Sequence, residues 1–467
     1  MARALAGLDR EAIADERWFG AKGRTIGSIE LEDAFVLDAA ASHVLAVARF
    51  GLDDGSWQRY TFVLTGRPLH VAAGGEGAAR ALLVAIADGR TIAALPREAD
   101  GQVRAILVCR PSAGLAELAP TMPDELAAVS ERPLDADQSN SSAVLGESVL
   151  LKVYRRLEEG LNPELELIAF LTEEAGFGAV PPLAGFAEMI SADVGASTVA
   201  IAEAFVADGD DAYESIAGSL TAWLLAPGSV SVEFATEVAA DLGALTAGLH
   251  GALANAQGIP DFEPRPATRD ELRGWGRAAR TQLSRAIDVV PGESGRLLRD
   301  LTPRIVSELS VFEALPSPPL LTRVHGDYHL GQVLIAPDGF RVVDFEGEPL
   351  RSLEERRAHQ SPLRDVASML RSLDHVGRSA GRRAETRNGG RLEQPGLDLD
   401  GWLRRSRERF LDAYKAGLRE AGAPIVVDPD LIRAFEIEKE CYEFIYAATY
   451  LPSWLWAPTE GMRGLFA

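Results

Sequence analysis

The N-terminal part of the chain alternates hydrophobic and polar residues over short runs. From about Ile29 to Thr91, segments such as HVLAVARF and QRYTFVLTG are separated by turns such as DDGS. Alternation with a period of two, bounded by turn residues, is typical of half-buried strands. The pattern predicts a small antiparallel sheet, and we assign residues 1–90 to an N-terminal β-rich cap domain.

A second strand-rich segment covers residues 91–206. Within it, QSNSSAVLGESVLLKVYRR reads as a hairpin whose strands are joined by a Gly-Glu turn. The following run, LNPELELIAFLTEEAGF, has Asn162 as an N-cap, Pro163 at the first helical position and Gly176 just past the end. These signals predict a short helix. STVAIAEAFV reads as a further strand.

Beyond residue 207 the hydrophobic spacing becomes helical, as in VEFATEVAADLGALTAGLHGAL. One hairpin interrupts the helices: PPLLTRVHGDYHLGQVLIAPDGFRVVDFEGEP, with a Pro-Asp-Gly turn at 337–339. Residues 376–396, VGRSAGRRAETRNGGRLEQPG, are basic and glycine-rich and lack apolar periodicity. We therefore expect a mobile loop there.

Length and charge restrict the class of protein. At 467 residues the chain is long enough for two or three packed units. A net charge of -22 disfavours nucleic acid and anionic membrane as partners. Its cysteines, Cys109 and Cys441, form no CxxC or Cys/His pattern, and no uncharged apolar stretch approaches the length of a membrane span. We expect a soluble cytoplasmic protein.

The hairpin in the helical part carries residues suited to phosphoryl transfer. This reaction needs metal ions on the nucleotide phosphates, a lysine that holds them, and a carboxylate that accepts the acceptor's proton. In HGDYHLGQ, Asp327 lies between strands, and Gln332 offers a carbonyl to a hard cation. Asp344 ends an apolar strand, with Glu346 nearby. The spacing matches the HRDxxxxN and DFG motifs of kinases, so we predict Asp327 as the catalytic base and Gln332, Asp344 and Glu346 as a magnesium site.

These motifs resemble those of a known kinase group. HGDYHLGQVL and DFEGEP, with WFGAKGR near the start and SPLRDVASMLRS after the hairpin, are similar to the actinobacterial maltokinase and glucosamine kinase group. That group is itself similar to aminoglycoside phosphotransferases and eukaryotic-type kinases. The resemblance extends over essentially the whole chain. It implies that Asp327 is the base and that Gln332 and Asp344 bind magnesium; Gln332 departs from the commoner kinase Asn but is typical of the maltokinase-like group.

The resemblance also implies an α+β, protein-kinase-like two-lobed fold with an extra cap. The strand-rich and helical segments fit that division. We assign residues 1–90 to the cap, 91–206 to the kinase N-lobe, and 207–467 to a helical C-lobe with the catalytic hairpin and the acceptor site.

The nucleotide site is expected in the N-lobe. Lys152, in the strand VLLKVY, is the natural ligand of the α- and β-phosphates, and we choose Glu166 over Glu164 as the helix carboxylate that orients it. The polar run before this hairpin would cover the phosphates through Ser139 and Ser141. The resemblance places three candidates at the adenine edge: Glu203, Ala204 and Phe205. The expected cofactors are ATP and Mg²⁺.

The C-terminal helix is the candidate acceptor surface. At 100° per residue, Glu436, Glu440, Glu443 and Tyr450 fall on one stripe. Carboxylates hold sugar hydroxyls and ammonium groups, and aromatic rings stack on sugar faces, which favours an amino sugar. Alternatively, the glutamates only solvate the helix, with Lys439 as a partial counter-ion. The remaining substrate candidates are Asp327, His329, Arg323 and Trp456.

Several neighbouring residues have supporting roles in this interpretation. His325 and His329 lack a suitable third metal ligand, so we interpret them as supports of Asp327. Asp365 either hydrogen-bonds the catalytic loop or is an ordinary charge at a helix N-terminus. The WFGAKGR cluster either anchors the cap or folds over the cleft, and its Trp-Phe pair favours anchoring.

The predicted reaction is transfer of the ATP γ-phosphoryl group to a small sugar, with the 6-hydroxyl of glucosamine as first choice and glucosamine 6-phosphate as product. A maltokinase making maltose 1-phosphate is the alternative. Maltokinases typically have an Arg-Asn-Arg-Pro-like stretch where this chain has Ala-Thr-Tyr-Leu-Pro, followed by Trp456 and Glu460, which resembles the glucosamine kinase branch. An aminoglycoside phosphotransferase and a non-catalytic sugar or nucleotide sensor stay open. The sequence does not set the oligomeric state.

Overall fold

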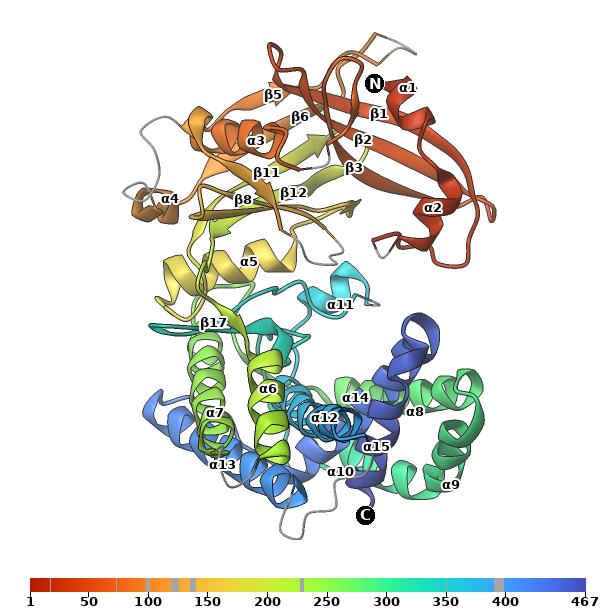
Figure 1. Cartoon of the computed structure of the whole chain (residues 1–467), viewed down its shortest axis with the longest axis vertical. Coiled ribbons are helices and arrows are strands. Elements are labelled where there is room, and N and C mark those ends of the chain that lie inside the picture. The colour runs from red at the N-terminus through yellow and green to blue at the C-terminus, as the bar shows by residue number, and fades with distance from the viewer. Residues whose placement is uncertain are drawn as a thin grey trace. The chain divides into compact units, whose positions relative to one another are not determined.

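The computed structural model of the chain describes residues 1–16, 18–72, 74–97, 101–118, 126–134, 140–226, 231–349, 351–389 and 399–467. The chain forms two compact units, Met1–Asp208 and Gly209–Ala467. Sheets dominate the first unit and helices the second (Figure 1). The α+β class predicted from the sequence is confirmed.

The first sheet of the N-terminal unit has the order β1-β2-β3-β10, with β4 paired to β3. Its strands are β1 (Ile26–Asp38), β2 (His43–Leu52), β3 (Trp57–Thr65), β4 (His70–Val71) and β10 (Arg156–Leu157), and α1 (Ala2–Ala6) and α2 (Arg10–Asp15) precede it. Trp18 packs edge-on against Tyr60 and Phe62. Lys22 donates through Nζ to the carbonyl groups that end α2. The WFGAKGR cluster therefore anchors this sheet.

The second sheet of this unit has seven strands in the order β5-β6-β11-β12-β9-β8-β7. They are β5 (Thr91–Ala93), β6 (Ala105–Pro111), β7 (Glu131–Pro133), β8 (Ser141–Leu145), β9 (Val149–Val153), β11 (Leu183–Ser191) and β12 (Gly195–Ala204). The intervening helices are α3 (Ala78–Ala87), α4 (Ala113–Leu118), η2 (Leu126–Ala128), α5 (Pro163–Ala169) and the π-helical turn η3 (Phe170–Glu174).

One hydrophobic core joins the two sheets. Phe35 and Val47 of the first sheet lie in the same buried cluster as Leu107 and Leu151 of the second, together with Leu83 of α3. The pairing of β10 with β3 links the sheets a second time. The segments expected to form a cap and an N-lobe therefore share a core rather than standing as separate packed bodies.

The short elements predicted around Lys152 are confirmed. Gly146 and Glu147 have φ angles of 61° and 53°, the left-handed pair that a tight hairpin turn between β8 and β9 requires. The side chain of Asn162 accepts a hydrogen bond of 2.8 Å from the backbone N–H of Glu164 at the start of α5. Gly176 follows the helical segment with φ 63°.

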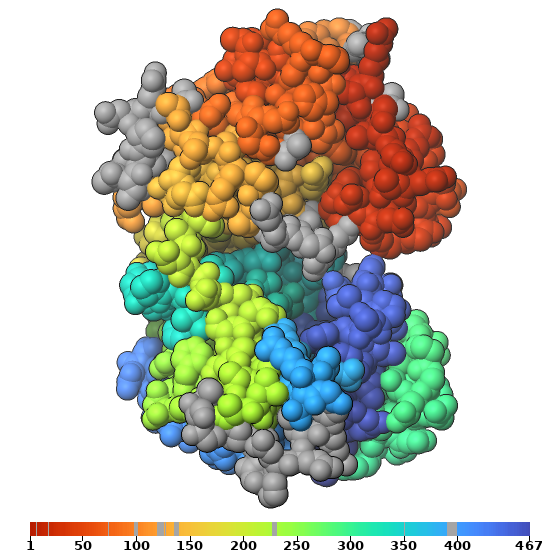
Figure 2. Space-filling model, in the orientation of Figure 1, coloured from red at the N-terminus to blue at the C-terminus, as the bar shows by residue number. Residues whose placement is uncertain are grey.

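Helices of very different lengths build the second unit. They are α6 (Ala212–Leu225), α7 (Glu233–Ala254), α8 (Arg269–Val289), α9 (Gly292–Leu309), α10 (Val311–Ala314), α11 (Leu353–Arg357), α12 (Leu363–Arg387), α13 (Leu399–Glu420), α14 (Pro429–Tyr450), η5 (Pro452–Trp454) and α15 (Trp456–Leu465). Helix α12 packs against both α6 and α14, and the lime-green surface of α6 adjoins the blue surface of α12 in Figure 2. Helix α13 runs along α7, where a Cβ on Gly243 would lie 2.2 Å from the carbonyl oxygen of Phe410.

The loop expected at residues 376–396 is wrong for its first half, because α12 continues to Arg387. Val376, Ala380 and Ala384 recur every four residues and are completely buried. These small apolar residues form a narrow buried stripe that the surrounding arginines and glycines obscure in the composition. The second half of the expected loop falls on residues outside the described ranges.

The predicted catalytic hairpin is present in the second unit. Strands β16 (Val333–Ala336) and β17 (Gly339–Val342) pair antiparallel, β13 (Asp210–Asp211) adds a third strand, and η4 (Leu330–Gln332) precedes them. A separate ladder joins β14 (Arg265–Pro266) to β15 (Leu320–Leu321). Among the residues that the structure describes, no helix is long and apolar enough to cross a membrane. Both cysteines are buried free thiols.

Candidate active site

Asp365, in the first turn of α12, holds the loop that carries Asp327. Its Oδ2 accepts from the backbone N–H of His325 at 2.8 Å, and its Oδ1 accepts from that of Gly326 at 3.0 Å. Burial raises the pKa of this carboxyl, but the contacts with His250, His325 and the Gly326 amide outweigh it and keep the pKa below its usual value. Of the two roles considered for Asp365, the hydrogen bond to the loop is the one observed.

His325 fixes the loop from the other side. Its Nε2 lies 3.0 Å from the carbonyl oxygen of Val343, and its Nδ1 accepts from the backbone N–H of Asp327 at 3.3 Å. The ring also packs on Phe345, with the centroids 4.6 Å apart. The imidazole thus joins the Asp327 loop to the end of β17, as a support rather than as a metal ligand.

Asp327 is a partly buried, ionised carboxylate, with a side chain that is 20% exposed. Its Oδ1 accepts a hydrogen bond of 3.0 Å from Lys439 Nζ, and its Oδ2 lies 3.9 Å from His329 Nε2. Burial alone would raise the pKa of Asp327, but the positive charge of Lys439 and the nearby His329 and His325 hold it at about 2. The carboxylate is therefore available as a proton acceptor at neutral pH.

Gln332 and Asp344 meet beside this loop. The side-chain amide of Gln332 donates to Asp344 Oδ2 at 3.1 Å. Asp344 has a φ of 64°, a left-handed conformation that non-glycine residues adopt rarely and that turns the chain sharply after β17. Carboxylate and amide oxygens are the ligands that hard cations prefer. The chemistry of these side chains fits a magnesium ion, with Glu346 two residues beyond Asp344.

Lys152 occupies a buried position on β9 in the N-terminal unit. Its Nζ donates to Glu164 Oε1 at 2.7 Å, and Tyr154 donates to Glu164 Oε2 at the same distance. Lys152 thus pairs with Glu164, the carboxylate that we ranked second, which is completely buried at the start of α5; the role predicted for Glu166 stays a prediction. Glu166 is also buried on α5.

The hairpin places a serine opposite the lysine. Ser142 of β8 is the register partner of Lys152, and Ser141 pairs with Val153. Ser139 lies outside the described residues.

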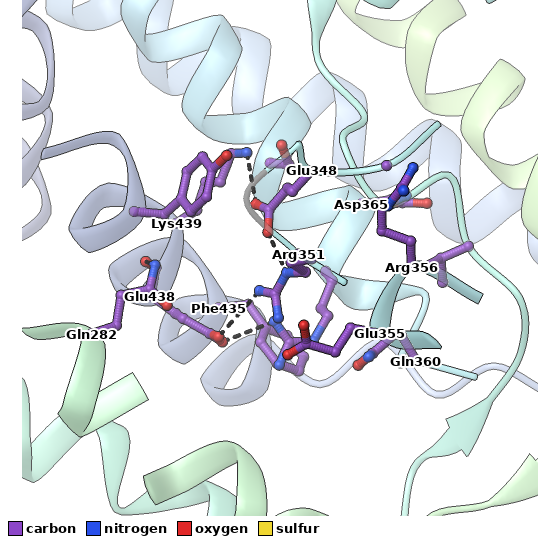
Figure 3. Close-up of a pocket in the computed structure, with 16 residues that line it drawn as sticks. Gln282, Glu348, Arg351, Glu355, Arg356, Gln360, Asp365, Phe435, Glu438 and Lys439 are labelled. Carbon is purple, nitrogen blue, oxygen red and sulfur yellow. Dashed lines mark hydrogen bonds and ion pairs between the residues drawn. The ribbon is translucent and has the colours of Figure 1, made fainter. Parts of the chain in front are cut away.

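A small charged cavity of about 50 Å³ adjoins the Asp327 loop (Figure 3). Helix α14 lines it with Glu438, Lys439 and Tyr442, and the segment after the hairpin contributes Glu348 and Arg351. Glu348 accepts from both Lys439 Nζ, at 3.0 Å, and Arg351. Because Lys439 bridges Glu348 and Asp327, the cavity and the predicted base belong to one polar cluster.

Comparisons with known proteins agree with this geometry. Residues 130–398 match the model of the phosphotransferase enzyme family. The chain belongs to this family. The phosphotransferase is 33% identical over 349 residues to the glucosamine kinase of Streptacidiphilus jiangxiensis, over 72% of this chain and 73% of that protein. It is 30% identical over 336 residues to the glucosamine kinase of Mycolicibacterium smegmatis, over 72% of this chain and 79% of the relative.

Solved structures extend the likeness to the full length of the phosphotransferase. A glucosamine kinase in complex with glucosamine, ADP and inorganic phosphate aligns over 100% of this chain and 99% of its own, with a TM-score of 0.71 and 27% identity. A glucosamine kinase in crystal form A aligns over 100% and 96%, with a TM-score of 0.75 and 26% identity. The predicted fold class and enzyme class are confirmed.

Two members of the acidic stripe, Glu436 and Glu440, do not line the cavity of the phosphotransferase. Glu436 and Glu440 are completely buried. Arg407 of α13 binds both carboxylate oxygens of Glu436, at 2.7 and 2.8 Å. Arg371 and His375 of α12 contact Glu440 Oε1 at 2.7 and 3.1 Å. Glu436 and Glu440 therefore do not solvate the helix, since cations of neighbouring helices bind both carboxylates, and their contact with a sugar stays a prediction.

Helix α15 packs on α14 over the Glu440 side chain. A Cβ on Gly461 would lie only 2.3 Å from Glu440 Oε1, so the absence of a side chain there allows the helix to approach. Glu443, in contrast, remains part of the polar cluster at the cavity, with its Oε1 3.5 Å from Lys439 Nζ.

Three further substrate candidates lie apart from the residues that line the cavity. Arg323 is buried, with its guanidinium 5.2 Å from the centroid of the Phe262 ring. Tyr450 is 38% exposed at the end of α14. The guanidinium of Arg382 lies over the Trp456 ring, with its Cζ 4.3 Å from the ring centroid. His329 is the substrate candidate that does lie beside Asp327, at 3.9 Å.

The adenine-edge candidates Glu203, Ala204 and Phe205 stay a prediction. The backbone N–H groups of Ala204 and Phe205 donate to the carbonyl oxygens of Pro182 and Ser148, at 2.9 and 2.8 Å. Glu203 is 2% exposed within β12. These two N–H groups are therefore used inside the N-terminal unit.

Proposed function

We propose that this phosphotransferase transfers the γ-phosphoryl group of ATP to the 6-hydroxyl of glucosamine, giving glucosamine 6-phosphate in the cytoplasm. The observation that carries the proposal is the ionised Asp327 beside a cavity lined by carboxylates and by cationic side chains. The full-length likeness to a glucosamine kinase with glucosamine and ADP supports the choice of acceptor and nucleotide.

Asp327 accepts the proton of the acceptor hydroxyl as that oxygen bonds to the γ-phosphorus and ADP leaves. The carboxylate is ionised, and its Oδ1 is held by Lys439 at 3.0 Å. Lys152, fixed by Glu164 at 2.7 Å, is the cation that neutralises the nucleotide phosphates. Ser141 and the segment before it would contribute further donors to the phosphates.

The acceptor enters the cavity beside α14. Glu348 and Glu438 line it, and Glu443 approaches from the same helix face. Carboxylates form charge-assisted hydrogen bonds with an ammonium group and accept hydrogen bonds from hydroxyls. Glu348 and Glu438 already pair with Arg351 and Arg364, so the choice of an amino sugar is supported by the likeness to the glucosamine kinase in complex with glucosamine.

Magnesium would be held by Gln332, Asp344 and Glu346. When bound, such an ion would neutralise the negative charge that develops on the nucleotide phosphates. Gln332 and Asp344 already lie in contact, at 3.1 Å. Asp344 is the anionic member of that contact, so it is expected to dominate the affinity.

Replacing Asp344 by Asn tests this assignment. The neutral amide is a weaker ligand, so the magnesium concentration that gives half-maximal activity should rise by at least about 10-fold. The measurement is initial rate against magnesium concentration at saturating nucleotide. Asp338→Asn, in the exposed turn of the same hairpin, is the matched control and should leave the curve unchanged. An unaltered curve for Asp344→Asn would show that the metal is held elsewhere.

The function itself is tested by ADP release with magnesium and ATP across glucosamine, N-acetylglucosamine, glucose, maltose and kanamycin. We expect turnover with glucosamine and at least about 100-fold lower kcat/KM with glucose, because the site's carboxylates lose an ammonium partner. Turnover confined to maltose would keep the kinase chemistry and overturn the amino-sugar assignment. ATP binding without turnover on any sugar would favour a non-catalytic sensor.

A further inference from the structure

Lys439 is the cation at the centre of the polar cluster. It lies on α14, and its side chain is 10% exposed. Its Nζ is 3.0 Å from Asp327 Oδ1 and 3.0 Å from Glu348 Oε1, and 3.5 Å from Glu443 Oε1. It also lies 4.7 Å from the centroid of the Tyr442 ring. An ammonium has three protons, and three carboxylate oxygens surround this one.

The contact with Lys439 distinguishes the two oxygens of Asp327. Oδ1 is bound to the ammonium, whereas the nearest cationic group to Oδ2 is the His329 ring at 3.9 Å. The backbone N–H of Asp327 is itself held by His325. With the main chain and one oxygen fixed, the carboxylate can present only Oδ2 to an acceptor.

The charges around Lys439 argue against a purely structural role. Burying an ammonium is costly unless it is paired, and buried ion pairs add little stability over apolar packing. Here the Lys439 ammonium contacts three carboxylates. Of these three, Arg351 contacts only Glu348. Without Lys439, Asp327 would face the like charges of Glu348 and Glu443, with the rings of His325 and His329 as its neighbours on the other side.

We propose that Lys439 is a positioning residue for phosphoryl transfer, which fixes the Asp327 carboxylate through Oδ1 and leaves Oδ2 for the acceptor hydroxyl. The inference rests on the proposed role of Asp327. It assigns Glu348 a part as well, because Glu348 is the second 3.0 Å anchor that places the ammonium.

The test uses Lys439→Met, which keeps the length of the side chain but removes its charge. We expect kcat to fall about 100-fold, the loss that follows from misplacing a reacting group, while KM for the acceptor stays within about threefold. Lys439→Arg should restore kcat to within about 10-fold of the wild type. Lys415→Met, at an exposed lysine of α13, is the charge-matched control. If Lys439→Met does not fold, Lys439→Gln replaces it with the same expectation.

A double-mutant cycle with Asp327→Asn separates this inference from the proposed function. If Lys439 acts through Asp327, adding Lys439→Met to Asp327→Asn should lower kcat by less than about threefold more.

A folded Lys439→Met enzyme with wild-type kcat, or additive losses in the cycle, would overturn the role of Lys439 alone. Wild-type kcat for Asp327→Asn would overturn the assigned base. The acceptor in these assays is the sugar of the panel above that gives the highest turnover. Absence of turnover on every sugar of the panel would overturn both the proposed function and the role of Lys439.

Discussion

Replacing Asp327 by Asn is expected to lower kcat by about 10²- to 10⁴-fold, the range that general acid–base catalysis typically contributes. The amide keeps the shape of the side chain but cannot accept the proton of the acceptor hydroxyl. Because the wild-type pKa of Asp327 is about 2, the carboxylate is ionised over the whole working range, and the loss should be the same from pH 6 to pH 9. The measurement is ADP release at saturating ATP and sugar.

Asp412→Asn is the matched control, at an exposed aspartate of α13, and should leave kcat unchanged. Circular dichroism should show the same helix content for both variants, and KM for ATP should stay within about threefold. Activity of Asp327→Asn within 10-fold of the wild type would remove Asp327 from the chemistry and leave His329 or water as the acceptor of the proton.

Replacing Arg371 by Met should destabilise the helical unit by about 3–5 kcal/mol, the cost of leaving a buried charge without its partner. Arg371 contacts Glu440 at 2.7 Å, Glu436 at 3.5 Å and Asp374 at 2.6 Å. Without it, Glu440 keeps only His375 among the cations found around it, and Asp374 keeps Arg378. The measurement is the free energy of unfolding in urea, followed by circular dichroism.

This variant also separates a structural role from a sugar-binding one. If the Glu436 and Glu440 cluster only stabilises the packing of α12, α13 and α14, KM for glucosamine should stay within about threefold in the folded variant. A large rise in KM with unchanged stability would restore the glutamates as acceptor ligands. Arg405→Met, at an exposed position of α13, is the control and should change stability by less than about 0.5 kcal/mol.

Local spacing explains why the sequence predicts the centre of the site well. Asp327, Gln332 and Asp344 lie on one hairpin, whose Pro-Asp-Gly turn fixes how its strands face each other. The structure brings the side-chain amide of Gln332 to 3.1 Å from Asp344 Oδ2 across this hairpin. The N-cap at Asn162 and the turn at Gly146 are predicted for the same reason, since each depends on a few adjacent residues.

Contacts between distant segments account for what the sequence could not predict. Lys439 is 112 residues from Asp327, and its position depends on how α14 packs in the second unit. The choice between Glu164 and Glu166 depends on which side of α5 meets β9, because both acids lie in the first turn of that helix. Helical periodicity could indicate a pair of carboxylates on one face, but not which helix that face meets.

The acidic stripe illustrates this limit. Glu436 and Glu440 are four residues apart, and so are Arg371 and His375 on α12. This complementary spacing is the signal that the sequence offered, and it is informative only when α12 and α14 are known to pack together. The same packing buries Val376 and Ala380, which extend α12 into the segment expected to be a loop.

The approach of Gly461 to Glu440 makes two positions of the chain mutually dependent during evolution. A side chain at 461 would require the Glu440 carboxylate to move, because a Cβ would lie 2.3 Å from its Oε1. That oxygen is held by Arg371 and His375, so the carboxylate cannot swing aside as a free surface side chain would. Replacing Glu440 first would leave Arg371 short of a counter-charge. A single substitution at Gly461 or at Glu440 is therefore disfavoured, and we expect these two positions to change together with Arg371 and His375.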